Sequence, residues 1–96
     1  MTKKIYKYEI PVQDDIRLDV PIGAKVLTVQ ADEKTGNPCI WMLVDPEEFD
    51  KEERRFRLSG TGHPIEDENN HAYIGTFQIH RGEFIGHLFE VLPNSR

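Results

Sequence analysis

Hydrophobic and polar residues alternate along most of the chain, which is the two-residue period of half-buried β-strands. One stretch breaks this alternation: residues 38–46 hold six consecutive apolar residues between two prolines. The run is too short to cross a membrane and shows no helical periodicity, so it predicts a strand covered on both faces. We therefore expect Pro38–Pro46 to contain the central strand of the core, with Trp41 largely buried.

Further strands are predicted around this central one. In each of them β-branched and aromatic residues alternate with polar ones, and turn-forming residues separate the segments. Pro21 cannot donate to a ladder, so it places the second segment at a sheet edge, whereas Pro11 either closes the first segment or marks an edge. The expected strands cover residues 5–10, 16–22, 25–31, 54–59, 72–80 and 83–92.

The third expected strand, residues 25–31, should pair directly with the central one. The intervening residues 32–37 are typical of a hairpin loop, in which Gly36 supplies a positive φ. Simple alternation places three of its side chains inward, namely Leu27, Val29 and Ala31.

The connection after the central strand is acidic. Asp45, Pro46 and Glu48 have the spacing of a helix start, with an N-cap, a proline at the first position and a glutamate three residues on. This predicts a single helical turn ending near Lys51. Residues 47–53 contain five acids and one lysine around a lone apolar residue, Phe49. A solvated connection is the favoured interpretation, and a docking protrusion is the alternative.

The last two strands should form a hairpin with a two-residue turn at Arg81-Gly82. One face of this hairpin is then mainly apolar, since Ile79 faces Phe84. The other face gathers polar residues, with Thr76 across from His87 and Gln78 across from Ile85. A bulge at the turn would shift this register by one residue and scatter the polar group. The predicted polar group consists of Thr76, Gln78, His80, Glu83 and His87.

These elements predict an all-β fold: a small single-domain barrel or sandwich of six to seven short, mainly antiparallel strands with at most one short helical turn. Ninety-six residues form one domain with one modest core, so residues 1–96 are taken together. Pro93 ends the regular structure, and residues 93–96 are expected to be a frayed tail.

The charge and the cysteine content limit the classes of partner and the cellular compartment that we expect. The net charge is −5, from 17 acidic and 12 basic residues, which argues against nucleic-acid binding. The one dense basic cluster, Arg54 to Arg57, directly follows Glu52 and Glu53, so a mutually neutralising face is expected. Cys39 is the only cysteine and lies in the apolar run, which predicts a buried, inert thiol. No signal peptide or membrane span is visible, and we expect a cytoplasmic protein.

The chain has no strong catalytic or metal-binding signature. Its four histidines, at positions 63, 71, 80 and 87, lack the short spacing of a preformed zinc pair, so neither metal nor cofactor is expected. No serine lies in a strand-to-helix elbow, and no catalytic residue is assigned. A metal-dependent enzyme built on these histidines is therefore the least favoured function.

Residues 60–71 form a twelve-residue connection, a length that is usually functional or mobile in a small domain. Its start, Gly60 to Pro64, superficially resembles a phosphate loop, but it lacks the lysine and the following helix. A shaped turn is the simpler interpretation. If the segment is functional, it should work with the last hairpin, and the predicted ligand-binding residues are Thr61, His63, Gln78, His80 and His87.

Several motifs resemble those of a family of small uncharacterised proteins from bacteriophages and prophages, a domain of unknown function. They are Cys39-Ile-Trp-Met-Leu-Val-Asp-Pro46, Gly60-Thr-Gly-His-Pro-Ile65, and Tyr73-Ile-Gly-Thr-Phe-Gln-Ile-His80 followed by His87-Leu-Phe-Glu90. The resemblance covers nearly the whole chain. It implies an accessory phage protein in a bacterial cytoplasm and transfers no functional residue.

Three functions are consistent with these patterns. The leading one is a non-catalytic binding protein that engages a host protein or a second copy of itself, without nucleic acid or membrane. The second is a small-ligand or nucleotide sequestering protein that uses the Gly60–Pro64 segment and the hairpin histidines. The third is the metal-dependent enzyme.

Overall fold

The computed structural model describes residues 2–93, which form seven strands and one 3₁₀ turn. The strands are β1 (Lys4–Glu9), β2 (Asp15–Pro21), β3 (Lys25–Ala31), β4 (Pro38–Val44), β5 (Lys51–Gly60), β6 (His71–Ile79) and β7 (Phe84–Val91), and the 3₁₀ turn η1 covers Glu68–Asn70. All seven predicted strands are present. Pro93 is exposed and lies outside the regular structure, while the rest of the predicted frayed tail lies outside the described residues.

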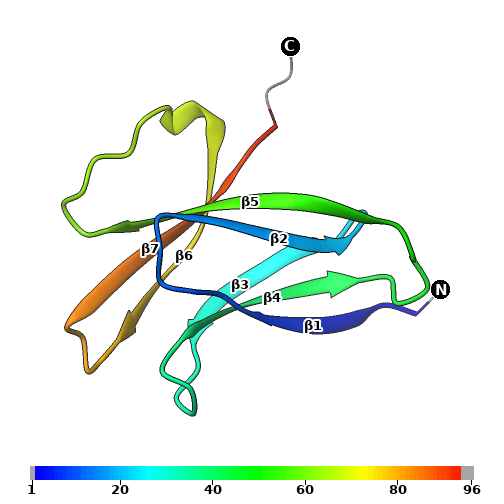
Figure 1. Cartoon of the computed structure of the whole chain (residues 1–96), viewed down its shortest axis with the longest axis horizontal. Coiled ribbons are helices and arrows are strands. Elements are labelled where there is room, and N and C mark those ends of the chain that lie inside the picture. Colours follow the sequence, from blue (N-terminus) through cyan, green and yellow to red (C-terminus); the bar gives the residue numbers. More distant parts are fainter. Residues whose placement is uncertain (1, 94–96) are drawn as a thin grey trace.

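The strands form two antiparallel sheets, with the orders β1-β4-β3 and β2-β5-β7-β6 (Figure 1). The all-β, antiparallel prediction is therefore confirmed, as is the direct pairing of β3 with β4. β1 and β2 lie at sheet edges, as Pro21 predicted for β2. In the part of the chain described, the two sheets do not join into a closed barrel. The finer choice between a sandwich and a barrel stays a prediction.

The hydrophobic core lies on the facing sides of the two sheets. All seven strands contribute to it or pack against it, and each buried aliphatic or aromatic side chain contributes about 1.5–3 kcal/mol. Its most deeply buried large members are Ile10, Ile16, Val20, Ile40, Met42, Val44, Phe56 and Leu88.

β4 is the central strand of its sheet, and its outer face is covered only in part. Ile40 and Met42 are fully buried on the core face, whereas on the outer face Cys39 is buried and Trp41 and Leu43 are half-buried. The prediction that β4 is covered on both faces is therefore wrong at Trp41 and Leu43, although most of the Trp41 side chain is buried. No layer of the described chain lies over this face, and the Trp41 ring is covered in part by Lys7, whose Nζ lies 5.5 Å from the ring centroid.

A bulge in β3 also changes one prediction. Val26 pairs with Met42 and Thr28 with Trp41, which leaves Leu27 as the extra residue. Because a bulge shifts the alternation by one residue, Leu27 is 42% exposed instead of turned inward. Beyond the bulge Val29 is buried, as predicted.

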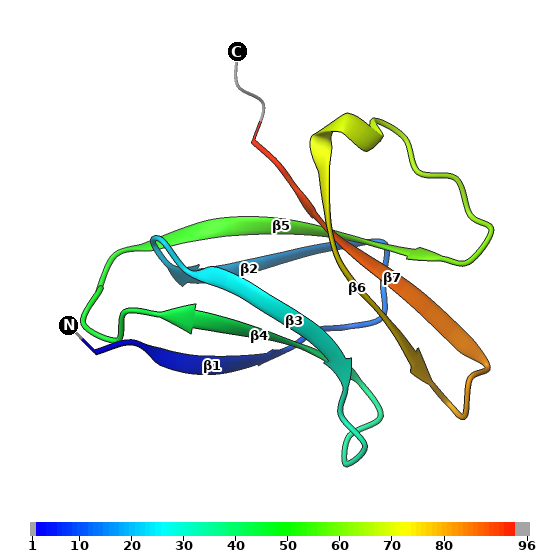
Figure 2. The same cartoon turned by 180° about the vertical axis from the view of Figure 1, so that it is seen from behind.

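The edge strands β3 and β6 of the two sheets lie side by side (Figure 2). The approach is tight at Gly75, where a Cβ atom would lie 3.1 Å from Cγ1 of Val29. A second bulge, between Tyr73 and Gly75, bends β6 here. The absent side chain of Gly75 therefore allows the two sheet edges to meet.

The acidic connection between β4 and β5 forms a tight turn and then extends, so the predicted helical turn there is wrong. Glu48 N–H donates to the Asp45 carbonyl at 3.0 Å, and Glu47 N–H donates to Oδ1 of Asp45, also at 3.0 Å. The capping part of the signature is thus present. The chain then extends instead of continuing into a helix, and the Asp50 carbonyl accepts from the Ile22 N–H on another loop. Among residues 2–93 no helix is long and apolar enough to span a membrane.

Candidate functional site

Two of the five predicted ligand-binding residues lie in contact. Thr61 Oγ1 lies 2.7 Å from Nε2 of His87, and Nδ1 of the same imidazole lies 2.9 Å from Thr76 Oγ1. Thr76 in turn lies 2.5 Å from the Tyr73 hydroxyl. The four groups form one hydrogen-bonded chain on the outer face of the four-stranded sheet. Sequence analysis had paired Thr76 with His87 but had no signal for Tyr73, because a bulge separates it from them.

The hairpin register explains this contact. Thr76 faces His87, Gln78 faces Ile85 and Ile79 faces Phe84, so these predicted pairings are confirmed. The turn itself spans four residues, 80–83, so the predicted two-residue turn at Arg81-Gly82 is wrong. His80 does not extend the strand. It lies in the turn with φ of +53° and is followed by Arg81 at +57° and Gly82 at +84°, so three consecutive residues are left-handed. His80 therefore leaves the polar face on which His87 lies.

Neither Gln78 nor His63 hydrogen-bonds to His87 within the described residues. A Cβ on Gly82 would lie 3.2 Å from Oε1 of Gln78, which places this amide beside the turn. A Cβ on Gly60 would lie 3.0 Å from the His63 ring, and His63 lines a shallow hollow with Thr61 and with Gly82 to Ile85. His63 thus shares a hollow with Thr61, whereas Gln78 lies at the turn. In residues 2–93 no group of three or more His, Cys, Asp or Glu side chains is placed to hold a metal ion.

A different feature stands out at the other end of the molecule, where the β4–β5 connection and the β2–β3 turn lie together (Figure 1). Phe49 is 88% exposed, the largest exposed fraction among the large apolar side chains described. Ile22 on the neighbouring turn is 49% exposed. We call this feature the Phe49 knob and define it as Ile22 and Phe49 with the surrounding acids Glu47, Glu48 and Asp50.

Backbone hydrogen bonds hold the Phe49 knob in place. Ile22 N–H donates to the Asp50 carbonyl at 3.0 Å and joins the two loops. Asp50 N–H donates to Oε2 of Glu48 at 3.0 Å, which fixes the chain on both sides of Phe49. The loop that carries the exposed Phe49 ring is therefore fixed by hydrogen bonds.

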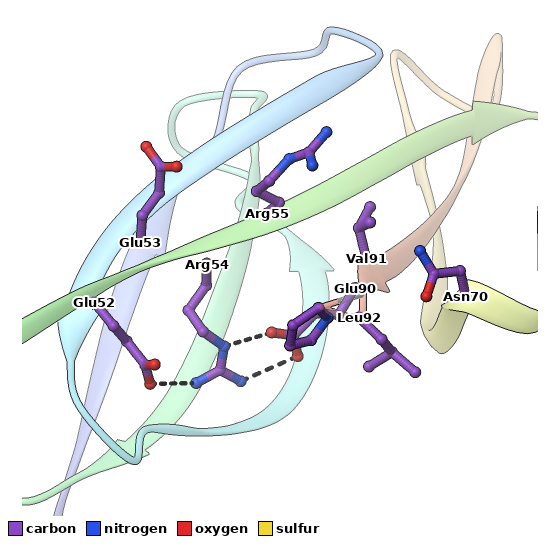
Figure 3. A pocket seen from close by; sticks show the side chains of 9 residues that line it. Glu52, Glu53, Arg54, Arg55, Asn70, Glu90, Val91 and Leu92 are labelled. Atoms are coloured by element: carbon purple, nitrogen blue, oxygen red, sulfur yellow. Dashed lines mark hydrogen bonds and ion pairs between the residues drawn. The ribbon is translucent and has the colours of Figure 1, made fainter. Parts of the chain in front are cut away.

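A partly buried charge network joins β5 and β7 to the β2–β3 turn that carries Ile22, and its side chains are drawn in Figure 3. Nη1 of Arg54 donates to the Ala24 carbonyl at 2.7 Å, and Arg54 also binds the Glu90 carboxylate through two of its N–H groups. Glu52 completes the network, because its Oε2 accepts from Gly23 N–H at 3.1 Å and lies 3.5 Å from Nη1 of Arg54. The hydrogen bonds to Glu90 raise the pKa of Arg54 above its ordinary value.

Sequence analysis found Phe49 and its acids but missed the rest of this feature. Ile22 lies 27 residues earlier in the chain, and nothing in its local pattern indicates a partner on another loop. Arg54 was expected to be part of a solvated basic cluster. Its phase within β5 places it with Phe56 on the core side, whereas Arg55 leaves the strand on the opposite side (Figure 3).

Comparison with known proteins returns one result. Neither a curated protein nor a solved structure gives a significant match to the chain. The model of one protein family matches it from end to end, over residues 1–96, and the chain therefore belongs to the family described as a domain of unknown function, DUF7352.

Proposed function

We propose that this is a non-catalytic binding protein that docks on another protein through the Phe49 knob. The observation that carries the proposal is the 88% exposure of Phe49 on a loop fixed by hydrogen bonds. The motifs that resemble bacteriophage proteins support a setting for it: an accessory phage protein that engages a protein of its bacterial host in the cytoplasm.

An exposed, well-positioned phenyl ring is an effective anchor. Aromatic side chains dominate the energetics of many interfaces, and burying one removes about 1.5–3 kcal/mol of unfavourable hydration. The Ile22–Asp50 hydrogen bond fixes the loop before binding, so less conformational entropy is lost on association. These terms favour a pocket that takes the Phe49 ring, with Ile22 against its rim.

The charges around the ring indicate the chemistry of the partner. Glu47, Glu48 and Asp50 flank Phe49 within three residues of sequence, and the whole chain carries a net charge of −5. Such a surface attracts basic surfaces and repels acidic ones during encounter. The proposed partner is therefore a folded protein with an apolar pocket bordered by lysine and arginine.

Site-specific photo-crosslinking tests this proposal. A photoreactive phenylalanine analogue placed at position 49 should capture one host protein, while the same analogue at position 12 should not. Val12 is a suitable control position because it is also exposed, at 45%, but lies in the β1–β2 connection at the opposite end of the sheets. Equal capture from both positions would contradict the proposal.

The captured protein is then purified and its affinity measured. Phe49→Ser should weaken binding at least tenfold, and Val12→Ser should leave the affinity unchanged. Sedimentation of the protein alone tests whether a second copy of the chain, rather than a host protein, binds the Phe49 knob. Dimerisation that disappears in Phe49→Ser would show that the knob binds a second copy of the chain and would overturn the host-protein assignment.

A further inference from the structure

The outer face of the four-stranded sheet presents an ordered grid of cationic and aromatic side chains. Arg55 faces Val91, which faces His71, and Arg57 faces Phe89, which faces Tyr73. Directly opposed residues of an antiparallel pair share one face, and Phe56 between the two arginines is buried on the other. Arginines therefore lie on one side of this face and aromatic rings on the other, with β7 between them.

On the arginine side of the face, one of three guanidinium groups has no ion-pair partner among residues 2–93. Arg17 on β2 lies directly opposite Arg55, an arrangement of like charges that destabilises a sheet. Arg17 has Glu53 at 3.6 Å and Arg57 has Asp15 at 3.3 Å. Within residues 2–93 no carboxylate lies within ion-pair distance of Arg55. An anion bound at Arg55 would offset this repulsion.

The aromatic side of the face is exposed but fixed. Tyr73 is 60% exposed, and its hydroxyl lies 2.5 Å from Thr76 Oγ1. Its ring packs edge-on against Phe89 with a centroid distance of 5.5 Å, and Phe89 also contacts the His71 ring at 6.2 Å. A ring held in this way can receive a second aromatic ring without losing further freedom, and such stacking contributes about 1–3 kcal/mol per nucleobase.

The separation of the two sides limits the size of the ligand. β5 and β6 are two strand spacings apart, or about 10 Å. This is comparable to the distance between the base and the 5′-phosphate of a single nucleotide. A base on Tyr73 would therefore place its phosphate near Arg55 and Arg57.

The connection formed by residues 61–70 limits how much negative charge the ligand can carry. A cleft beside the grid is lined by Arg55, Arg57, Asn70 and His71, and also by the acids Asp15, Glu66 and Asp67. His71 Nδ1 donates to the Asp67 carbonyl at 2.8 Å, so Nε2 of the neutral ring is a hydrogen-bond acceptor. The three carboxylates oppose a triphosphate or a phosphate backbone far more strongly than one phosphate group.

We propose that this face is a binding site for a planar aromatic molecule bearing a single phosphate, the chemistry of a nucleoside 5′-monophosphate. The base stacks on Tyr73, and the phosphate binds Arg55 with help from Arg57. The site lies on the other sheet face from the core and does not use the Phe49 knob. It is thus independent of the proposed protein-docking function.

Titrations followed by NMR of the isotope-labelled protein test this site. Adenosine and uridine 5′-monophosphates are compared with the matching nucleosides, with inorganic phosphate and with a short single-stranded oligonucleotide. At least one monophosphate should bind tenfold or more tightly than its nucleoside and than phosphate. The shifted signals should belong to Arg55, His71, Tyr73 and Phe89.

Two variants test the two halves of the site separately, and a third serves as a control. Arg55→Gln should reduce the affinity for the monophosphate to that for the nucleoside, and Tyr73→Leu should reduce it to that for phosphate. Lys25→Gln removes the same charge from the other sheet and should have no effect. The proposal is overturned if the monophosphate binds no more tightly than phosphate or nucleoside, if the control variant loses as much affinity, or if only the oligonucleotide binds.

Discussion

Arg54 and Glu90 lie diagonally across the β5–β7 ladder and meet on its core side in two hydrogen bonds, one of them 3.0 Å between Nη2 and Oε1. Their side chains are only 18% and 16% exposed. The same guanidinium binds the Ala24 carbonyl, so one arginine joins two strands of the four-stranded sheet to the turn that carries Ile22.

The first prediction concerns this pair. Glu90→Gln leaves the guanidinium partly buried without its countercharge and should lower the free energy of unfolding by about 2–3 kcal/mol. Chemical denaturation measures this change. Glu53→Gln is the control, because the Arg17–Glu53 pair is half exposed and such pairs contribute less than about 1 kcal/mol. Equal losses in the two variants would contradict a supporting role for Glu90.

A second prediction compares two large aromatic residues. Phe56 is 1% exposed, and Phe56→Ala should cost about 3–5 kcal/mol of stability. Trp41 is half-buried on a partly covered face, so Trp41→Ala should cost only about 1–2 kcal/mol. Unfolding curves of the two variants give the order directly. A Trp41→Ala variant that is the less stable of the two would show that the outer face of β4 is covered.

The third prediction concerns a glycine inside β7. A Cβ on Gly86 would lie 2.7 Å from Cζ of Phe77 and 2.9 Å from Cδ1 of Leu58. Gly86→Ala should therefore destabilise the protein by about 1–3 kcal/mol through overpacking. Combining it with Phe77→Leu makes room for the methyl group, so the double variant should be more stable than the sum of the single changes implies. Strict additivity would refute the steric explanation.

A fourth prediction follows from Lys7 and Asp32. Their 2.7 Å contact is the main cause that lowers the pKa of Asp32 and raises that of Lys7. The folded-state pKa of Asp32 is thus depressed, so its contribution is present above the unfolded value of about 3.9 and is lost as the pH falls below it. Lys7 lies over the Trp41 ring, so Trp41 fluorescence should change in this acidic range.

Lys7→Met removes the ammonium group and keeps most of the aliphatic stem. In this variant the acidic change in Trp41 fluorescence should disappear while the fold persists. An unchanged titration in the variant would mean that another group is responsible for the signal.

The fifth prediction concerns salt. Exposed charges are screened beyond about 8 Å at physiological ionic strength, so the association rate of the Phe49 knob with a basic partner should fall as salt is added. Replacing Glu47 and Glu48 with lysine should slow association and leave thermal stability nearly unchanged. Stopped-flow experiments measure the association rate at several salt concentrations. A rate that does not change with salt would show that the acidic residues do not contribute to docking.

Alternation along the chain was sufficient to predict six of the seven strands, because each half-buried strand carries its own two-residue signal, and the unbroken apolar run predicted β4. The β6–β7 register was predictable for the same reason, since Arg81 and Gly82 mark the turn and fix Thr76 across from His87. The central position of β4 also followed from its sequence. These are local properties, and they depend on neighbours in the chain.

Non-local features were not predictable in this way. The extra residue Leu27 looks like any other member of β3, and only the pairing with β4 shows the bulge. An apolar run such as residues 39–44 is compatible with a strand that is buried on both faces. It is equally compatible with a strand that is buried on one face and leaves apolar side chains partly exposed on the other. The joining of Ile22 to Asp50 and of Arg54 to Glu90 depends on loops and strands that lie far apart in sequence. His80 left the polar face because three successive left-handed residues turn it away.

The meeting of β3 and β6 at Gly75 also bears on how the protein behaves when it is concentrated. An open strand edge offers unpaired N–H and C=O groups to other chains and invites strand-to-strand aggregation. β3 and β6 shelter each other, and the remaining edges of the described sheets carry Lys4 and Lys7 on β1 and Pro21 on β2, which discourage such pairing. A bulky side chain at position 75 would push the sheltered edges apart, and the two exposed edges could then act as templates for aggregation.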